Sequence, residues 1–226
     1  MLSITKRELL DAGPCYSGRD AIDAILENYD YDTPIPVEKA LEFDAEYTMW
    51  GISEIKDESQ EEERDRILKT FAYLCVEHVY ENFEERTGDR ECTAEDVKLV
   101  KDAVDACKEY LLGKIDIDEL CRYDGPVESL TKRIDSLDTN SYIVDAVYYL
   151  IEGLTCCNDN ELEDFTDVVR SARNSMYFEN DITEHKEWQK KRLHELLTHP
   201  EMLFPCKMRG KEDAEEECVQ SGEEES

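Results

Sequence analysis

The sequence predicts an all-α protein, built as a single compact domain of about nine helices. Apolar residues recur every four positions in two adjacent rows between residues 64 and 83, which gives one helix with a broad apolar face. A second segment, residues 142–154, is hydrophobic nearly all round, as expected for a helix buried on most sides. No apolar segment is joined to a partner strand by a hairpin turn, so no sheet is expected.

Shorter helices are predicted in the N-terminal quarter. A helix over residues 3–12 should end at the Gly-Pro pair that follows it. Ser17 is placed to cap a second helix, and residues 30–36 form a loop with two prolines. From residue 37 the apolar spacing predicts a helix that continues to residue 52, with Trp50 packing near its inward face.

The remaining helices follow from caps and spacing. Thr93, with Asp96 three residues later, predicts the capped start of a helix that ends at Gly113. Further helices are expected over residues 116–123, 125–137, 162–178 and 183–197. After residue 206, eight acidic and three basic residues with almost no large apolar ones predict a disordered tail. The expected division is a helical domain of residues 1–206 and an acidic tail of residues 207–226.

Charge is the most unusual property of the chain. It has 57 acidic and 26 basic residues, a net charge of −31. Such a charge argues against direct binding to nucleic acid or to an anionic membrane, so any partner selected by charge is a basic protein. The simplest alternative explanation of the acidity is that it keeps the protein soluble, because runs of charge usually form solvated faces. Adaptation to high salt is less consistent with the nine cysteines, twelve tyrosines and common lysines.

The cysteines and the first residues indicate a cytoplasmic protein. The nine cysteines are odd in number, lack a C-x-x-C pair and fall in several cases on apolar helix faces, which favours reduced thiols. The first thirteen residues carry charges and do not resemble a secretory signal. No run of about 18 apolar residues is present, so no membrane span is expected.

Motifs for catalysis or metal binding are scarce. No two histidines stand four residues apart, as zinc-binding pairs on a helix do. Only Glu77, His78 and Glu81 place carboxylate and imidazole together on the central helix. The adjacent Cys156 and Cys157 have acidic surroundings, which disfavour a reactive thiolate. Without a Gly-rich phosphate loop or a G-x-S-x-G motif, the sequence predicts neither an enzyme nor a cofactor.

The acidic surface is the remaining candidate for function. Acids three or four residues apart on a helix present charges about 5–6 Å apart, a scale similar to that of successive phosphates on a nucleic-acid strand. A protein with such a face could occupy the basic groove of a nucleic-acid-binding protein. The predicted partner-binding residues lie on and just before the central helix: Glu58, Glu61, Glu62, Glu63, Asp65, Glu77, Glu81, Glu84 and Glu85.

Two segments, about a sixth of the chain, resemble known groups. The opening of this chain contains Ile4-Thr5, Leu9-Leu10 and Gly13-Pro14-Cys15. It resembles the start of many small phage and bacterial proteins. The closing segment of helical immunity proteins from bacterial toxin systems resembles the last predicted helix, Glu187-Trp188-Gln189 and Leu193-His194-Glu195-Leu196-Leu197. The middle of the chain departs from that group, because it lacks Ala-rich repeats and is far more acidic. The resemblance implies an all-helical, non-enzymatic protein that acts against another macromolecule. It does not assign a functional role to any residue.

Together these features predict a phage or mobile-element protein in the cytoplasm of a bacterial host. It would inhibit a basic, nucleic-acid-binding partner, such as a CRISPR or restriction nuclease of host defence, by imitating nucleic acid. Two alternatives stay open: an immunity protein that neutralises a cognate toxin, and a metal-dependent helical enzyme. Mimicry predicts binding that collapses at high salt, whereas a shape-specific immunity contact would lose much less. An enzyme would show a metal or a deep pocket with converging ionisable groups.

Overall fold

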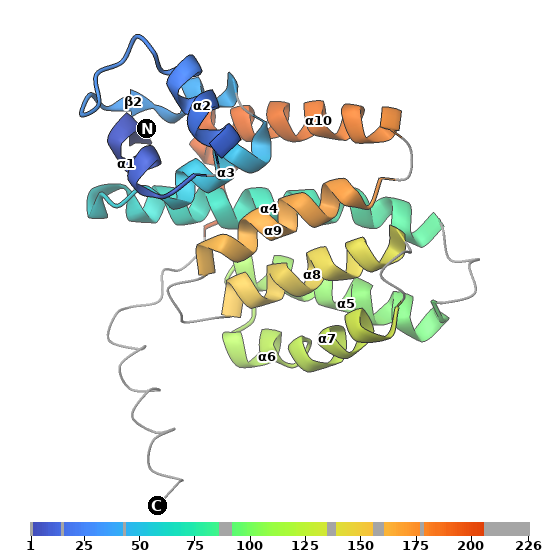
Figure 1. The fold of residues 1–226 in the computed structure, drawn as a ribbon. Coiled ribbons are helices and arrows are strands. Elements are labelled where there is room, and N and C mark those ends of the chain that lie inside the picture. Colours follow the sequence, from blue (N-terminus) through green and yellow to red (C-terminus); the bar gives the residue numbers. More distant parts are fainter. Residues whose placement is uncertain are drawn as a thin grey trace, which may run out of the picture.

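The computed structural model describes residues 2–14, 16–42, 44–85, 92–134, 139–155, 161–176 and 179–205, and these are mostly helical (Figure 1). The all-α prediction is confirmed. The α-helices are α1 (Lys6–Asp11), α2 (Tyr16–Ile25), α3 (Ala45–Ser53), α4 (Glu61–Glu85), α5 (Ala94–Leu111), α6 (Ile117–Cys121), α7 (Asp124–Arg133), α8 (Thr139–Thr155), α9 (Glu161–Asn174) and α10 (Glu179–Thr198). Three 3-10 helices, η1 (Val37–Glu42), η2 (Glu58–Gln60) and η3 (Pro200–Met202), and two strands, β1 (Ser3–Ile4) and β2 (Ile35–Pro36), complete the described elements.

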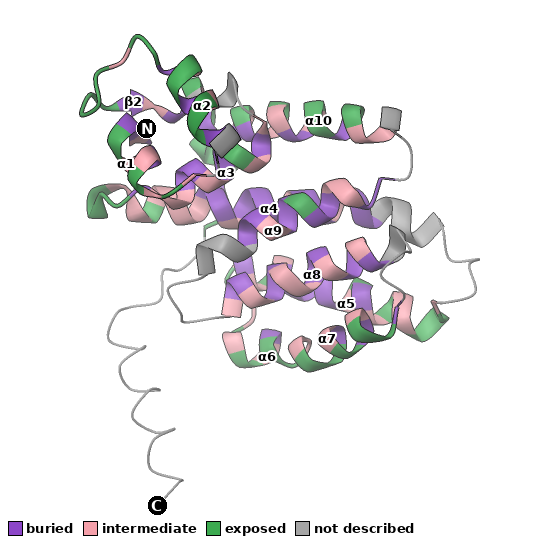
Figure 2. Ribbon diagram, in the orientation of Figure 1, coloured by how far each residue is buried: buried purple, intermediate pink, exposed green. Residues whose placement is uncertain are grey.

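The centre of the fold is formed by α4, α8 and α9. Helices α8 and α9 make the most extensive helix pair, and both pack on α4. The four-residue rows of α4 are buried as their spacing predicts, with Phe71 and Val76 fully inaccessible, and Phe165 of α9 is equally buried. Figure 2 shows buried residues running along these three helices and exposed residues along α6 and α7. The two helices predicted to form the core therefore lie in it.

The other helices cover this centre. Helix α5 packs on α4 and α8, α6 and α7 pack on both α5 and α8, and α10 contacts α4 and α9 (Figure 1). The short N-terminal elements gather at one end, where α3 contacts α9 and α4. Within the described ranges, no helix combines the length and apolar character that crossing a bilayer requires.

A small sheet lies at the N-terminal end and corrects the prediction that no strands pair. Strand β1 runs antiparallel to β2, with Ser3 opposite Pro36 and Ile4 opposite Ile35. The helix predicted over residues 3–12 therefore begins only at Lys6, after the N-cap Thr5. Strands of two residues are too short to show an alternating pattern, which is why the sequence does not reveal them.

Two other boundaries differ from the prediction. The helix expected over residues 37–52 is divided into η1 and α3, because Asp44 adopts an extended conformation and its carboxylate accepts the backbone N–H of Tyr47 at 3.0 Å. Ser17 lies inside α2 and is not its cap. The predicted acidic tail, residues 207–226, falls outside the described residues.

The start of α5 follows the predicted capping box. The Thr93 hydroxyl accepts the backbone N–H of Asp96 at 3.2 Å, and the Asp96 carboxylate accepts the backbone N–H of Thr93 at 2.8 Å. Asp96 also forms an ion pair with Arg133 of α7. Burial opposes ionisation of Asp96, but these hydrogen bonds outweigh it and hold its pKa below the usual range. The cap therefore joins α5 to α7.

We expect Thr93→Ala to lower the unfolding free energy by about 1 kcal/mol, because it leaves a backbone N–H of α5 without its acceptor. Urea denaturation of wild type and variant measures this difference. Ser129→Ala is the matched control: Ser129 is exposed on α7 and its hydroxyl donates only to the Gly125 carbonyl, so a change within about 0.5 kcal/mol is expected. Equal losses in the two variants would contradict a specific role for the cap.

The segment after α10 returns to the middle of α4. The backbone N–H of Phe204 donates to the Thr70 hydroxyl at 3.1 Å, and Arg66 Nε donates to the Phe204 carbonyl at 3.1 Å. The Phe204 ring meets the Tyr73 ring edge to face, with centroids 5.4 Å apart. Three residues of α4 therefore hold this segment in place.

Candidate functional site

The most acidic stretch of the described chain joins α3 to the first turns of α4. Residues 44–65 contain nine acidic and two basic side chains. Asp57 caps η2 through hydrogen bonds from the Ser59 hydroxyl at 2.7 Å and the Ser59 backbone N–H at 2.9 Å, which hold the pKa of Asp57 below its usual range. Carboxylates at the start of α4 also suit the partial positive charge of a helix N-terminus. The acids of residues 57–63 therefore lie at the start of α4, whereas Glu46 at the start of α3 pairs with Arg170 and Arg173 of α9.

Three of the predicted residues form what we call the acidic stripe: Glu58, Glu61 and Glu62. Glu58 and Glu62 are exposed and Glu61 is half-buried. Glu58 stands three residues before Glu61 and four before Glu62, so its charge lies about 5–6 Å from each of theirs, whereas Glu61 and Glu62 are adjacent and point in different directions around the helix. None of the three forms an ion pair with any residue in the described part of the chain. Their negative charge is therefore directed to solvent.

The next two predicted acids are in a different environment. Asp65 is 13% exposed in its side chain and pairs with Arg64 at 2.8 Å, and Arg64 also donates to the Ile55 carbonyl at 2.7 Å. The charge of Asp65 is thus balanced by a cation that is itself mostly covered. Glu63 is half-buried. Neither residue extends the acidic stripe as an exposed, unpaired carboxylate.

Glu77 is held by two partners from neighbouring turns and helices. Its Oε1 accepts hydrogen bonds from Lys108 Nζ of α5 at 2.8 Å and from the Tyr73 hydroxyl at 2.7 Å. Burial opposes ionisation of Glu77, but the bonds from Lys108 and Tyr73 outweigh it and lower its pKa. Burial, followed by Glu77, raises the pKa of Tyr73, so the phenol keeps the proton it donates. Glu77 therefore links α4 to α5.

The nine predicted residues are spread over η2 and the length of α4. Residues 62 and 81 are nineteen positions apart on α4, and at 1.5 Å per residue the helix separates them by about 29 Å. The backbone of Glu81, Glu84 and Glu85 belongs to the last turns of α4, and their side chains fall outside the described residues. The structure thus brings together Glu58, Glu61 and Glu62.

A polar groove of about 300 Å³ lies between α4 and α10, and the sequence did not single it out. Its walls include Glu77 and His78 from α4 and Trp188, Lys191 and Arg192 from α10. The His78 and Trp188 rings stack with centroids 4.0 Å apart and an interplanar angle of 7°. Bases and acids share this groove, so it does not continue the acidic stripe.

His185 extends the ring stack into the interior. Its ring lies 5.2 Å from that of His78 and 5.5 Å from that of Trp188, in nearly parallel planes. The side chain is buried, and neither ring nitrogen has a hydrogen-bond partner. Burial above all, with smaller contributions from His78 and Arg173, lowers the pKa of His185 to about 3. The three-residue spacing of His185 and Trp188 can be seen in the sequence. Their contact with the His78 ring of another helix cannot.

These rings give little support for metal chemistry. Nearly parallel imidazoles do not converge on a common ion, and the Glu77 carboxylate is already occupied by Lys108 and Tyr73. Among the residues described, no group of three histidine, cysteine or carboxylate side chains is placed to hold a metal ion. No family model, curated protein or solved structure matches this chain. We therefore infer function from the chemistry of the protein's own surfaces.

Proposed function

We propose that this protein is a non-enzymatic acidic binding protein whose acidic stripe contacts a basic surface on a nucleic-acid-binding partner. The observation that carries the proposal is that Glu58 and Glu62, which are exposed, and Glu61, which is half-buried, have no neutralising cation in the described chain. The net charge of −31 adds a long-range field that attracts cationic proteins and repels nucleic acid and anionic membranes. The stripe supplies the local contact, and the field brings the partner to it.

The spacing of the stripe favours a nucleic-acid-binding partner over other basic proteins. The charge of Glu58, about 5–6 Å from those of Glu61 and Glu62, suits lysines and arginines arranged to contact successive phosphates. Each exposed ion pair contributes about 0.2–1 kcal/mol at low salt, so three together change affinity by about 3-fold to about 150-fold. Such contacts mainly speed association and fix orientation, while other contacts supply the rest of the affinity.

We expect the triple variant Glu58→Gln, Glu61→Gln and Glu62→Gln to bind its partner about tenfold more weakly at low salt. The full chain is immobilised, host lysate is passed over it, and bound proteins are eluted with a salt gradient or with a 20-base-pair DNA duplex at constant ionic strength. A partner that binds through the stripe should be eluted from the wild type by the DNA duplex. It should be eluted from the variant at a lower salt concentration than from the wild type. At about 1 M salt, charges more than about 3 Å apart are largely screened, so binding is lost in both proteins.

The matched control carries the same change in net charge at exposed glutamates elsewhere, Glu109→Gln, Glu184→Gln and Glu187→Gln on α5 and α10. Its affinity should stay within about twofold of wild type if the stripe makes the contact. Equal weakening of both triple variants would show that net charge alone attracts the partner. If neither salt nor DNA releases the bound partner, the result would contradict the proposal. It would favour a shape-specific contact like that of an immunity protein.

A further inference from the structure

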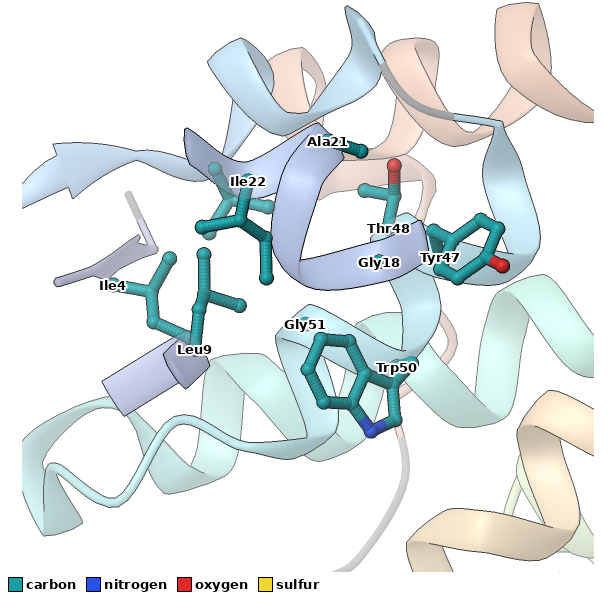
Figure 3. Close-up of a pocket in the computed structure, with 10 residues that line it drawn as sticks. Ile4, Leu9, Gly18, Ala21, Ile22, Tyr47, Thr48, Trp50 and Gly51 are labelled. Atoms are coloured by element: carbon teal, nitrogen blue, oxygen red, sulfur yellow. The ribbon is translucent and has the colours of Figure 1, made fainter. Parts of the chain in front are cut away.

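An apolar pocket of about 240 Å³ lies at the N-terminal end of the fold, enclosed by β1, α1, α2, η1 and α3. Figure 3 shows Ile4, Leu9 and Ile22 gathered on one side of it, with Tyr47 and Trp50 on the other. Ile4, Leu9 and Ile22 are buried, Trp50 is half-buried, and Tyr47 is 44% exposed. The pocket thus extends from aliphatic side chains in the interior to an aromatic ring at the surface.

Small residues leave this space open. Gly18 and Ala21 of α2 and Gly51 of α3 line the pocket where these helices face each other. A Cβ atom at Gly51 would lie 3.3 Å from Leu9 Cδ2, so α1 already approaches α3 closely at that point. Larger side chains at Gly18 or Ala21 would fill the pocket. The hollow therefore follows from residue size on two facing helices.

The lining determines the chemistry of the ligand. No charged side chain among the described residues lines the pocket. The Thr48 hydroxyl donates to the Asp44 carbonyl at 2.9 Å, so it is already satisfied by its own helix. Placing a charged or strongly polar group among such residues is unfavourable, because it would lose its hydrogen bonds to water. The pocket selects an uncharged, apolar molecule.

The volume determines the size of the ligand. Protein interiors are close-packed, and voids larger than a water molecule are few. An engineered apolar cavity of about 150 Å³ in another protein stays dry and binds benzene, which has six carbon atoms. By proportion, the pocket here accommodates about nine or ten non-hydrogen atoms. We propose that it is a binding site for a small uncharged hydrocarbon-like molecule, such as an alkylbenzene or a short alkyl chain, independent of the acidic stripe.

The direct test is titration of the full chain with n-propylbenzene, followed by methyl NMR. We expect saturable binding with a dissociation constant on the order of 0.1 mM. Methyl resonances of Ile4, Leu9 and Ile22 should shift, while that of a core residue on a helix that does not line the pocket, such as Val127 of α7, should not. 3-Phenylpropionate, which replaces the terminal methyl group by a carboxylate, should bind at least about thirtyfold more weakly. Equal binding of both probes, or shifts spread over the whole core, would overturn the proposal.

A variant that fills the space provides the second test. Ala21→Leu extends a side chain into the pocket, and we expect at least about a tenfold loss of n-propylbenzene affinity. Ala24→Leu is the matched control, because Ala24 is exposed on the same helix and its variant should bind as wild type does. If Ala21→Leu does not fold, the smaller Ala21→Val replaces it, with a smaller loss expected. Unchanged affinity in a folded pocket variant would place the probe elsewhere and exclude this site.

Discussion

Lowering the pH from 7 to 4.5 is expected to cost the protein about 3 kcal/mol of unfolding free energy through His185 alone. Its pKa is about 3 in the folded chain and 6.5 when unperturbed. Between these values the unfolded state binds a proton that the folded state does not, so each pH unit costs about 1.4 kcal/mol. The stabilisation is complete above pH 6.5 and is lost as the pH falls toward 3.

His185→Phe isolates this contribution, because it keeps a ring in the stack with His78 and Trp188 but cannot titrate. Urea denaturation of wild type and variant at pH 7 and pH 4.5 gives the four free energies required. Carboxylates such as Glu77, whose pKa is lowered, are common to both proteins and cancel in the comparison. The variant should lose about 3 kcal/mol less than wild type between the two pH values.

The matched control is His194→Phe, which replaces an exposed histidine on the same helix. It should keep the pH dependence of wild type. If His185→Phe also keeps it, then His185 is not the buried neutral group described above. A second expectation concerns pH 7 itself: His185→Phe should be no less stable than wild type there, because it removes two buried nitrogens that lack partners.

Gly153→Leu is expected to destabilise the protein by about 3 kcal/mol or more. A single Cβ atom at this position of α8 would lie 2.8 Å from Phe165 Cε1 and 3.0 Å from Cζ, closer than carbon atoms pack. Phe165 is fully buried on α9, so its ring has no free space to move into. Overpacking of a core costs about 1–3 kcal/mol for small additions, and leucine adds three further carbon atoms beyond this Cβ. Thermal or urea denaturation measures the loss.

Two further variants test the cause. Gly153→Ala should still destabilise by about 1–2 kcal/mol, although alanine is favoured over glycine in a helix by about 1 kcal/mol. Gly51→Ala in α3 is the comparison, since a Cβ there would meet only the Leu9 Cδ2 atom, at 3.3 Å at the end of a flexible side chain, and should cost less than Gly153→Ala. Phe165→Leu combined with Gly153→Ala should cost less than the sum of the two single changes. Strict additivity would contradict a direct clash.

Helix patterns could be read from the sequence wherever one face is buried. The four-residue rows of α4 and the apolar run of α8 give nearly the observed bounds, because burial of those faces is what stabilises the helices. Strands β1 and β2 leave no such pattern, since two residues carry no period. The apolar spacing runs continuously through η1 and α3, and the break between them comes from the competing hydrogen bond of Asp44 with Tyr47.

The candidate site could be predicted only where it is local. Glu58, Glu61 and Glu62 are neighbours in sequence and remain neighbours on the helix start. The distance of about 29 Å between Glu62 and Glu81 was also calculable from the length of α4. The pairing of Glu77 with Lys108 and the stacking of His78 on Trp188 join separate helices, so no local pattern reveals them.

The contacts of Phe204 set a limit on how far the carboxyl end can be shortened. Thr70 is fully buried, and its hydroxyl accepts the backbone N–H of Phe204. A truncation after Pro205 retains that donor, whereas removal of Phe204 would open the side of α4 to water and expose Tyr73 as well. Carboxyl-terminal truncations should therefore lose stability abruptly once Phe204 is removed. Limited proteolysis should likewise stop before this residue.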